Sequence, residues 1–257
     1  MSYGDHLEAL RPHLVRSLLL FALLLIAAFA LRTLIIDKIL FGPTLADFST
    51  NRLLSYLSQR MGIEAPLVCQ EGLSFINTSL AGQLNLHLKI SMMTALVVGF
   101  PYLAWELWRF IKPALKESEL RACRWFTLVV SLGFFSGILF GYFVISPLTV
   151  NFLGSYSASS SIVNMIDAGS YLSTIVEVSL ACAIIFQLPL LVYFLSRMGV
   201  VSSNFMQRYR RHAIVALAAI SAIITPPDIF SMILVILPLM LLYEGSIGIA
   251  RRVERHT

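Results

Sequence analysis

Charged residues are scarce in this chain of 257 residues. They make up 13% of it, about half the share found in an ordinary soluble domain, whereas hydrophobic residues reach 58%. A soluble globule of this size has too little polar surface to cover so much apolar surface. The composition therefore excludes a soluble enzyme, a nucleic-acid-binding module and a disordered tail, and it indicates a membrane protein. The net charge of +5 then matters less than the side of the membrane on which the basic residues lie.

Residues that would support catalysis or metal binding are also missing. The three cysteines, Cys69, Cys123 and Cys182, form no C-x-x-C spacing, and the five histidines form no H-E-x-x-H pattern. The sequence contains no phosphate-binding loop. An intramembrane protease of the rhomboid type would need a membrane histidine, and every histidine falls in a predicted loop or terminal segment. We therefore expect no enzyme activity, no catalytic residue, no metal and no cofactor.

Apolar runs long enough to cross a hydrocarbon core of about 30 Å are predicted to form six spans. They cover residues 17–36, 90–110, 125–147, 170–195, 213–225 and 229–250. The fifth run extends only about 20 Å as a helix, so it needs a thinned bilayer or submerged ends. Because Pro226-Pro227-Asp228 separates it from the sixth run, the sequence predicts an all-α polytopic membrane protein that ends in a short helical hairpin over Ala213–Ala250.

Lysine and arginine are distributed unequally between the two sides of the predicted membrane. Fourteen of the 19 lie in the N-terminal segment, the loops 111–124 and 196–212 with the adjoining span ends, and the C-terminal tail. The positive-inside rule therefore places both termini in the cytoplasm and the loop 37–89 outside. The run before Ala28-Phe29-Ala30 also resembles a cleavable signal peptide, whose removal would leave five spans and opposite termini. The acids Asp5 and Glu8 ahead of the run disfavour that alternative.

Several features are predicted outside the spans. Asn51–Met61, within the long outer loop, has a helical pattern. In Tyr3–Leu14, three leucines recur at helical spacing with charges on other faces, which predicts an interfacial amphipathic helix. The two halves of the chain do not repeat each other, which disfavours a transporter built from inverted repeats.

Glu177 and Gln187 fall inside the predicted fourth span. A charged Glu177 would cost at least about 2.5 kcal/mol in a bilayer unless it finds water, a proton or a partner. It is either a hydrogen-bonded residue of the bundle interior or part of a polar lining. Gln187 could bond a backbone carbonyl freed by Pro189. The two lie roughly 80° apart around one helix, so they need not share a face.

The loop 111–124 contains two acids, Glu117 and Glu119. Pro113 is expected to start a short helix there. Residues two apart on a helix do not face each other, so Arg121 does not neutralise Glu119, which is free to bind outward. An ordinary solvated loop is the alternative interpretation.

Five motifs in this order resemble the TatC family, the core subunits of the twin-arginine protein translocase. The N-terminal His6-Leu7-Glu8-Ala9-Leu10-Arg11 and Leu14 are similar to its H-L-x-E-L-R-x-R-L opening, and Phe110 to Leu115 with Glu119 to its F-x-x-P-A-L-x-x-x-E motif. The remaining matches are Gly141-Tyr142-Phe143 with Ser146-Pro147-Leu148, Ser170-Tyr171-Leu172 with Phe186-Gln187-Leu188-Pro189, and Thr225-Pro226-Pro227-Asp228. They extend over nearly the whole chain.

The resemblance implies a receptor in the bacterial inner membrane. It would bind the Arg-Arg signal peptides of folded cargo proteins and self-associate in the receptor complex. It would also organise single-span TatA/TatB-type partners in the lipid bilayer for export driven by the proton-motive force. Glu119 is the expected carboxylate for the arginine pair, because a guanidinium offers a planar donor fork. Phe110 and Pro113 would shape the surface beside it, together with Glu8 and Arg11 of the N-terminal segment.

Further roles follow from the same resemblance. Ala9 stands where the family has Glu, and Glu8 is one position earlier, so its carboxylate is turned by about 100°. Gln187 would face a membrane-side cavity, whereas Glu177 matches no motif of the family. The residues Ile223, Thr225, Pro226 and Asp228 would contact a partner helix. A small-solute or proton-coupled carrier using Glu177 and Gln187 is the alternative function.

Overall fold

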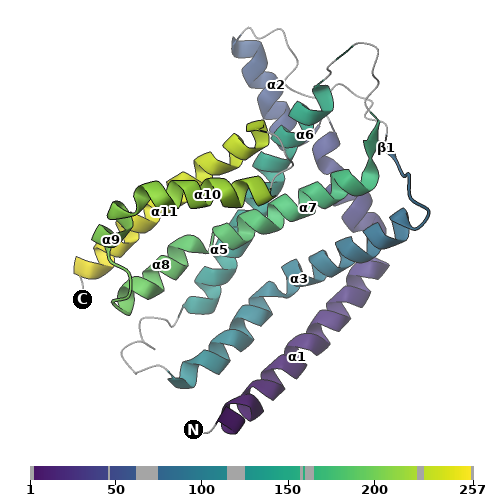
Figure 1. Cartoon of the computed structure of the whole chain (residues 1–257). Coiled ribbons are helices and arrows are strands. Elements are labelled where there is room, and N and C mark those ends of the chain that lie inside the picture. The colour runs from purple at the N-terminus through teal and green to yellow at the C-terminus, as the bar shows by residue number, and fades with distance from the viewer. Residues whose placement is uncertain are drawn as a thin grey trace.

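The computed structural model describes residues 3–45, 47–61, 75–114, 125–156, 159, 165–224 and 229–255, and helices dominate this part of the chain (Figure 1). The long helices are α1 (Tyr3–Ala30), α3 (Gly82–Ile111), α5 (Phe126–Phe140), α7 (Ala168–Ile185), α10 (Arg210–Ile224) and α11 (Ile229–Arg255). Shorter helices are α2 (Ser49–Met61), α6 (Ser146–Ser155), α8 (Leu188–Arg197) and α9 (Ser203–Arg208). The remaining elements are η1 (Thr33–Leu40), η2 (Gly42–Thr44), η3 (Lys112–Ala114), η4 (Gly141–Ile145), β1 (Phe75–Ile76) and β2 (Ile166–Asp167).

Five helical segments in the described part are long and apolar enough to cross a membrane. They are Leu10–Ala30, Gly82–Ile111, Phe126–Ser155, Ala168–Arg197 and Met232–Arg255. This confirms the predicted helical membrane protein. The sixth predicted span corresponds to α11, whereas α10, which covers most of the fifth, has 15 residues and is shorter than these five segments.

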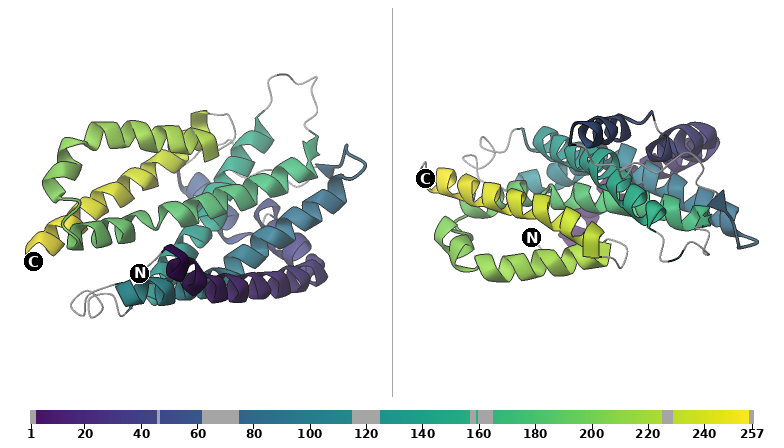
Figure 2. Two further views of the ribbon diagram at one scale, coloured as in Figure 1. Left: turned by 60° about the horizontal axis from the view of Figure 1, so that its bottom comes forward. Right: turned by 90° about the horizontal axis from the view of Figure 1, so that it is seen from above.

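Both ends of the chain lie at the same end of the helix bundle (Figure 1). We call this the N/C end, and it also holds Ile111 at the end of α3; the opposite end is called the far end. Helices α10 and α11 lie side by side in every view (Figures 1 and 2) and contact each other. Helix α5 also begins at the N/C end (Figure 1).

The start of the chain differs from the expectation. Instead of an interfacial helix over Tyr3–Leu14 and a separate span over residues 17–36, a single helix α1 covers Tyr3–Ala30 and contains Pro12. No helix-breaking residue separates the amphipathic part from the apolar part, so one helix continues through both. After Leu31 the backbone widens into the π-helix η1, which extends past residue 36 to Leu40.

The predicted outer loop 37–89 is largely structured. Helix α2 confirms the helical pattern of Asn51–Met61, and α3 already begins at Gly82. His87 and Lys89 are therefore residues of a membrane helix and not of a loop. His87 stacks on Phe29 of α1 with 3.8 Å between ring centroids and bonds its carbonyl oxygen through Nε2.

Polar and aromatic contacts close the far end of the bundle. Asn51 of α2 donates to the carbonyl of Pro43 at 2.9 Å and accepts from Asn151 of α6, also at 2.9 Å. The strands β1 and β2 pair in parallel, with Phe75 opposite Ile166. Phe75 and Phe41 both pack against the ring of Tyr171, which is 5% exposed. The aromatic contacts join Phe41 and β1 to α7, and the asparagine contacts join α2 to η2 and α6.

The third and fourth spans are less regular than a single helix. The third continues from α5 through the π-helix η4 into α6, up to Ser155. The fourth is interrupted at Phe186 and Gln187, and α8 resumes with Pro189 in its first turn. Proline suits the first turn of a helix because its missing N–H has no intrahelical partner there.

Helices α5 and α7 cross at very short distance, along a row of small residues. A side chain added at Gly137 would place its Cβ 2.5 Å from the Cα of Ala183, and one at Gly141 would place it 2.5 Å from the Cα of Ser179. One turn earlier, Gly133 faces the side chain of Gln187 with more room, at 3.4 Å. Close approach of this kind is how membrane helices gain van der Waals contact. The crossing therefore fixes where the α7–α8 break lies against α5.

We expect Gly137→Ala to destabilise the folded protein by about 1–3 kcal/mol, because the new methyl group meets backbone atoms of α7 that have to shift. Gly248→Ala is the matched control: it lies in α11, and an added Cβ meets nothing within 4 Å there. Thermal unfolding of the purified protein in one detergent measures both. Equal unfolding temperatures for the two variants would contradict the close crossing.

Candidate functional site

The expected site residues of the first two helical segments lie at the N/C end. Phe110 is half-buried near the end of α3, and Pro113 is exposed in η3, the single turn that follows. Arg11 is exposed on α1, which packs along α3. The backbone of Glu8 belongs to α1, but its side chain lies outside the described residues, as does the whole of Glu119.

A buried acid beside these residues was missed by the sequence analysis. Glu106 of α3 is 2% exposed, and its carboxylate accepts a hydrogen bond from the Tyr102 hydroxyl at 2.9 Å. The other carboxylate oxygen contacts Nδ1 of His13 on α1. Arg109 Nη1 lies 3.7 Å from the first oxygen, and its guanidinium stacks over Trp105 at 4.9 Å. The carboxylate of Glu106 therefore has two partners on α3, about one turn before and after it, and a third partner on α1.

The sequence contained a signal for this cluster. Glu106 interrupts the apolar run of the second span as Glu177 interrupts the fourth, and a membrane acid needs a partner in either place. Tyr102 and Arg109 at helical spacing of four and three residues supply two of its partners. The partner from α1, His13, depends on which faces of the two helices meet.

Gln187 contributes to a wide apolar groove. Its amide donates to the carbonyls of Val130 and Ala183, each at 3.3 Å. The expected partner was the carbonyl that Pro189 frees. Instead, the backbone N–H of Gln187 donates to the carbonyl of Ile184 at 3.0 Å. The carbonyl of Ala183 therefore accepts from the side chain of Gln187.

The groove has a volume of about 580 Å³ and lies between α5, α8 and α11. Apart from Gln187 and Ser136, its lining is apolar or aromatic, with Trp125, Phe126, Tyr193 and Phe194 toward the N/C end. Trp125 directly follows the loop that contains Glu119. An elongated apolar segment entering from that loop would find a matching surface here.

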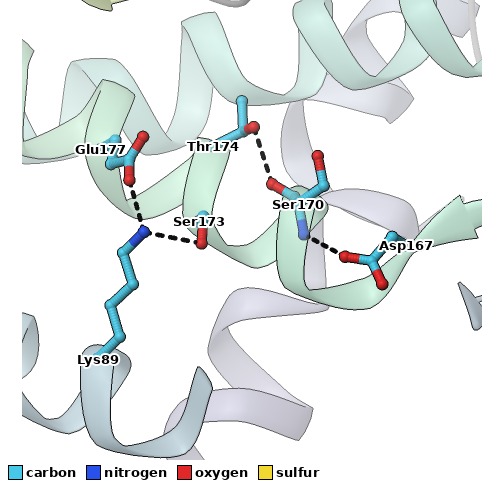
Figure 3. A network of polar contacts seen from close by, with 6 residues as sticks. All are labelled: Lys89, Asp167, Ser170, Ser173, Thr174 and Glu177. Atoms are coloured by element: carbon cyan, nitrogen blue, oxygen red, sulfur yellow. Dashed lines mark hydrogen bonds and ion pairs between the residues drawn. The ribbon is translucent and has the colours of Figure 1, made fainter. Parts of the chain in front are cut away.

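Glu177 has a partner that the sequence analysis placed in a loop. Lys89 of α3 donates to its carboxylate at 2.6 Å and to the hydroxyl of Ser173 at 3.0 Å (Figure 3). The side chains of Lys89 and Glu177 are 39% and 53% exposed. One turn toward the far end, Thr174 donates to the carbonyl of Ser170 (Figure 3). The ion pair therefore joins α3 to α7, and Glu177 and Gln187 have separate partners.

The expected partner-helix residues lie in the last turn of α10 and after it. Ile223 is 84% exposed, whereas Ser221 is fully buried and donates to the carbonyl of Met232 on α11 at 3.0 Å. Thr225, Pro226 and Asp228 lie outside the described residues. Within the described ranges, no group of three or more His, Cys, Asp or Glu side chains is placed to hold a metal ion.

The sequence and structure are similar to known translocase proteins. The family model described as "Sec-independent protein translocase protein (TatC)" matches residues 5–238. The TatC protein of Blattabacterium sp. subsp. Periplaneta americana is 35% identical over 99% of this chain and 97% of its own length. That of Desulforapulum autotrophicum is 34% identical over 97% and 84%.

A solved structure agrees with these relatives. The crystal structure of the twin-arginine translocase receptor TatC in the detergent DDM superposes with a TM-score of 0.75 and 29% identity. It covers 95% of this chain and 98% of the crystallised one. The match to the sequence family and the match to the fold both extend over nearly the full length. The chain therefore belongs to the TatC family of Sec-independent protein translocase proteins.

Proposed function

We propose that this chain is the signal-peptide receptor of a twin-arginine translocase. As a TatC protein it takes part in Sec-independent protein transport as a multi-pass protein of the inner membrane. The finer proposal is that it binds the Arg-Arg signal peptides of folded cargo and organises TatA/TatB-type partners for export driven by the proton-motive force. It is a binding protein in this proposal, and not an enzyme.

The observation that carries the proposal is the placement of Phe110 and Pro113. They lie at the N/C end beside α1 and lead directly into the loop with Glu119. A carboxylate at that position meets an arginine pair with two parallel N–H···O bonds per guanidinium, which a lysine cannot reproduce. The apolar groove that starts at Trp125, after the same loop, suits the hydrophobic segment behind the arginines.

Replacing Glu119 with Ala is expected to lower photo-crosslinking of an Arg-Arg signal peptide in membranes by about 10–100-fold, the loss for a charge-assisted hydrogen bond of about 1.5–3 kcal/mol. Glu119→Lys should abolish it, because a like charge repels the arginines. Glu117→Ala removes the other acid of the same loop and is the matched control, expected to label as the original protein does. A Lys-Lys peptide gives the background.

The carrier alternative makes the opposite prediction for the same assay and for export in cells. Under the receptor proposal Glu177→Gln is mild, because the Gln side chain keeps an oxygen that accepts from Lys89 and Glu177 matches no family motif. A carrier would lose transport with Glu177→Gln and tolerate Glu119→Ala. Labelling that is indifferent to both Glu119 and the arginine pair would reject the receptor proposal.

We further propose six spans with both termini in the cytoplasm. The two termini share one end of the bundle (Figure 1), and α10 and α11 contact each other as a hairpin would require. At about 22 Å, the 15 residues of α10 are short for a 30 Å core. A locally thinned bilayer beside this helix would accommodate it.

Cysteine labelling tests this orientation in a variant without the three native cysteines. Gln59→Cys in α2 should react with a membrane-impermeant maleimide on intact spheroplasts. Thr257→Cys should react only after the membrane is opened, because the positive-inside rule places the tail inside. Labelling of Thr257→Cys from outside would place the C-terminus outside and contradict the proposed orientation.

For the partner helix we propose the end of α10 and the turn after it. Ile223 projects outward, at 84% exposed, and a polar side chain of a partner span could bond Thr225 for about 0.6–2 kcal/mol. Ile223→Cys is therefore expected to form a disulfide with a cysteine in the span of a TatA/TatB-type subunit. Val215→Cys, also exposed on α10 but two turns away, is the control. Equal crosslinking at both positions would argue against a site at the turn.

A further inference from the structure

A buried carboxylate joins α1 to α3 at the N/C end, outside the motifs that resemble the family. Glu106 is 2% exposed, whereas its neighbours His13 and Arg109 are 20% and 43% exposed in their side chains. An acid costs free energy in this position unless it is fully bonded. The carboxylate of Glu106 makes contacts with its neighbours that an apolar residue at this position could not make.

Only one of the bonds of Glu106 described here crosses between helices. Tyr102 and Arg109 belong to α3 itself, about one turn before and after Glu106. His13 comes from α1, 93 residues earlier in the chain. Loss of the His13 contact would therefore leave the bonds of Glu106 within α3 intact and weaken the attachment of the start of α1, which also packs along α3 elsewhere.

The same histidine touches a residue of the proposed signal-peptide site. The ring of His13 meets the ring of Phe110 edge to face, with 6.2 Å between centroids and 69° between planes. Two residues before His13 is Arg11, and three residues after Phe110 is Pro113. The contact from Glu106 through His13 to Phe110 thus connects the N-terminal segment to the segment that leads to Glu119.

We propose that Glu106 and His13 are positioning residues that make the signal-peptide site selective for Arg-Arg over Lys-Lys. This inference rests on the receptor function proposed above. A guanidinium fork bonds a carboxylate in one planar geometry, whereas an ammonium is a point charge that accepts many. Displacement of the N-terminal segment therefore costs binding of Arg-Arg more than binding of Lys-Lys. Glu106 itself does not touch the peptide, because its side chain is buried.

The test compares photo-crosslinking of Arg-Arg and Lys-Lys signal peptides to the full chain in membranes. Glu106→Leu is expected to reduce the Arg-Arg to Lys-Lys ratio by about tenfold, equivalent to about 1.4 kcal/mol, with little change for Lys-Lys. Glu106→Gln keeps the shape and an oxygen that accepts from His13, so it should retain most of the selectivity. His13→Leu should lower the ratio as Glu106→Leu does, and the double variant should be no worse than either, because both variants remove the same contact between His13 and Glu106.

The matched control is Glu244→Gln, which removes the charge of an exposed acid paired with Arg210 on another side of the bundle. It should leave the ratio unchanged. A purely structural role for Glu106 would lower the amount of folded protein and leave the ratio of the remaining protein unchanged, and that result overturns the inference. If Glu106→Leu does not accumulate, His13→Leu and His13→Gln carry the same comparison.

A second measurement needs no signal peptide. In the variant without native cysteines, a bis-maleimide should link Arg11→Cys to Pro113→Cys, and Glu106→Leu should reduce that yield several-fold. Unchanged linking overturns the positioning role even if the receptor function holds. If the original protein labels Arg-Arg and Lys-Lys peptides equally, the receptor proposal fails, and the selectivity inference fails with it.

Discussion

The close crossing of α5 and α7 is the constraint on which the rest of this bundle depends. Gly137 and Gly141 let the two backbones meet where any side chain would collide with Ala183 or Ser179. In lipid, no hydrophobic effect drives helices together, so packing of this kind has to supply the association energy. With α5 and α7 fixed, the break at Gln187 falls opposite Gly133, and the groove opens where α8 departs from α5.

Around this crossing, polar groups inside the membrane segments connect neighbouring helices. Glu106 joins α3 to α1, Lys89 and Glu177 join α3 to α7, and Gln187 joins α8 to α5. Each such group is expensive in lipid unless bonded, so each bond also specifies which helix faces which. The apolar side chains, which are interchangeable in this respect, fill the space between. The polar residues therefore add specific pairing to the arrangement that helix packing supplies.

The sequence predicted the helical membrane fold and the family, because apolar runs and short motifs are local properties. It placed Lys89 in a loop, since seven further residues of α3 precede it and a weakly apolar helix start resembles a loop. It left the role of Glu177 open because the partner, Lys89, is 88 residues away in the sequence. Glu106 was overlooked because its partner His13 depends on helix facing, which no periodicity within one segment reveals. The sequence alone could not predict which polar residues on different helices pair with each other.

The positions of the polar residues and of the glycine crossing fit a receptor better than a carrier. A carrier needs its binding groups on elements that move against each other, near the middle of the membrane. Here Glu177 and Gln187 have separate partners on α3 and α5. The glycine crossing between α5 and α7 resists motion of these two helices against each other. The described residues that the proposal assigns to the arginine pair, Arg11, Phe110 and Pro113, lie at the N/C end of the bundle (Figure 1). A helix bundle with a fixed core can select a peptide through a recognition segment at one end, without moving its helices against each other.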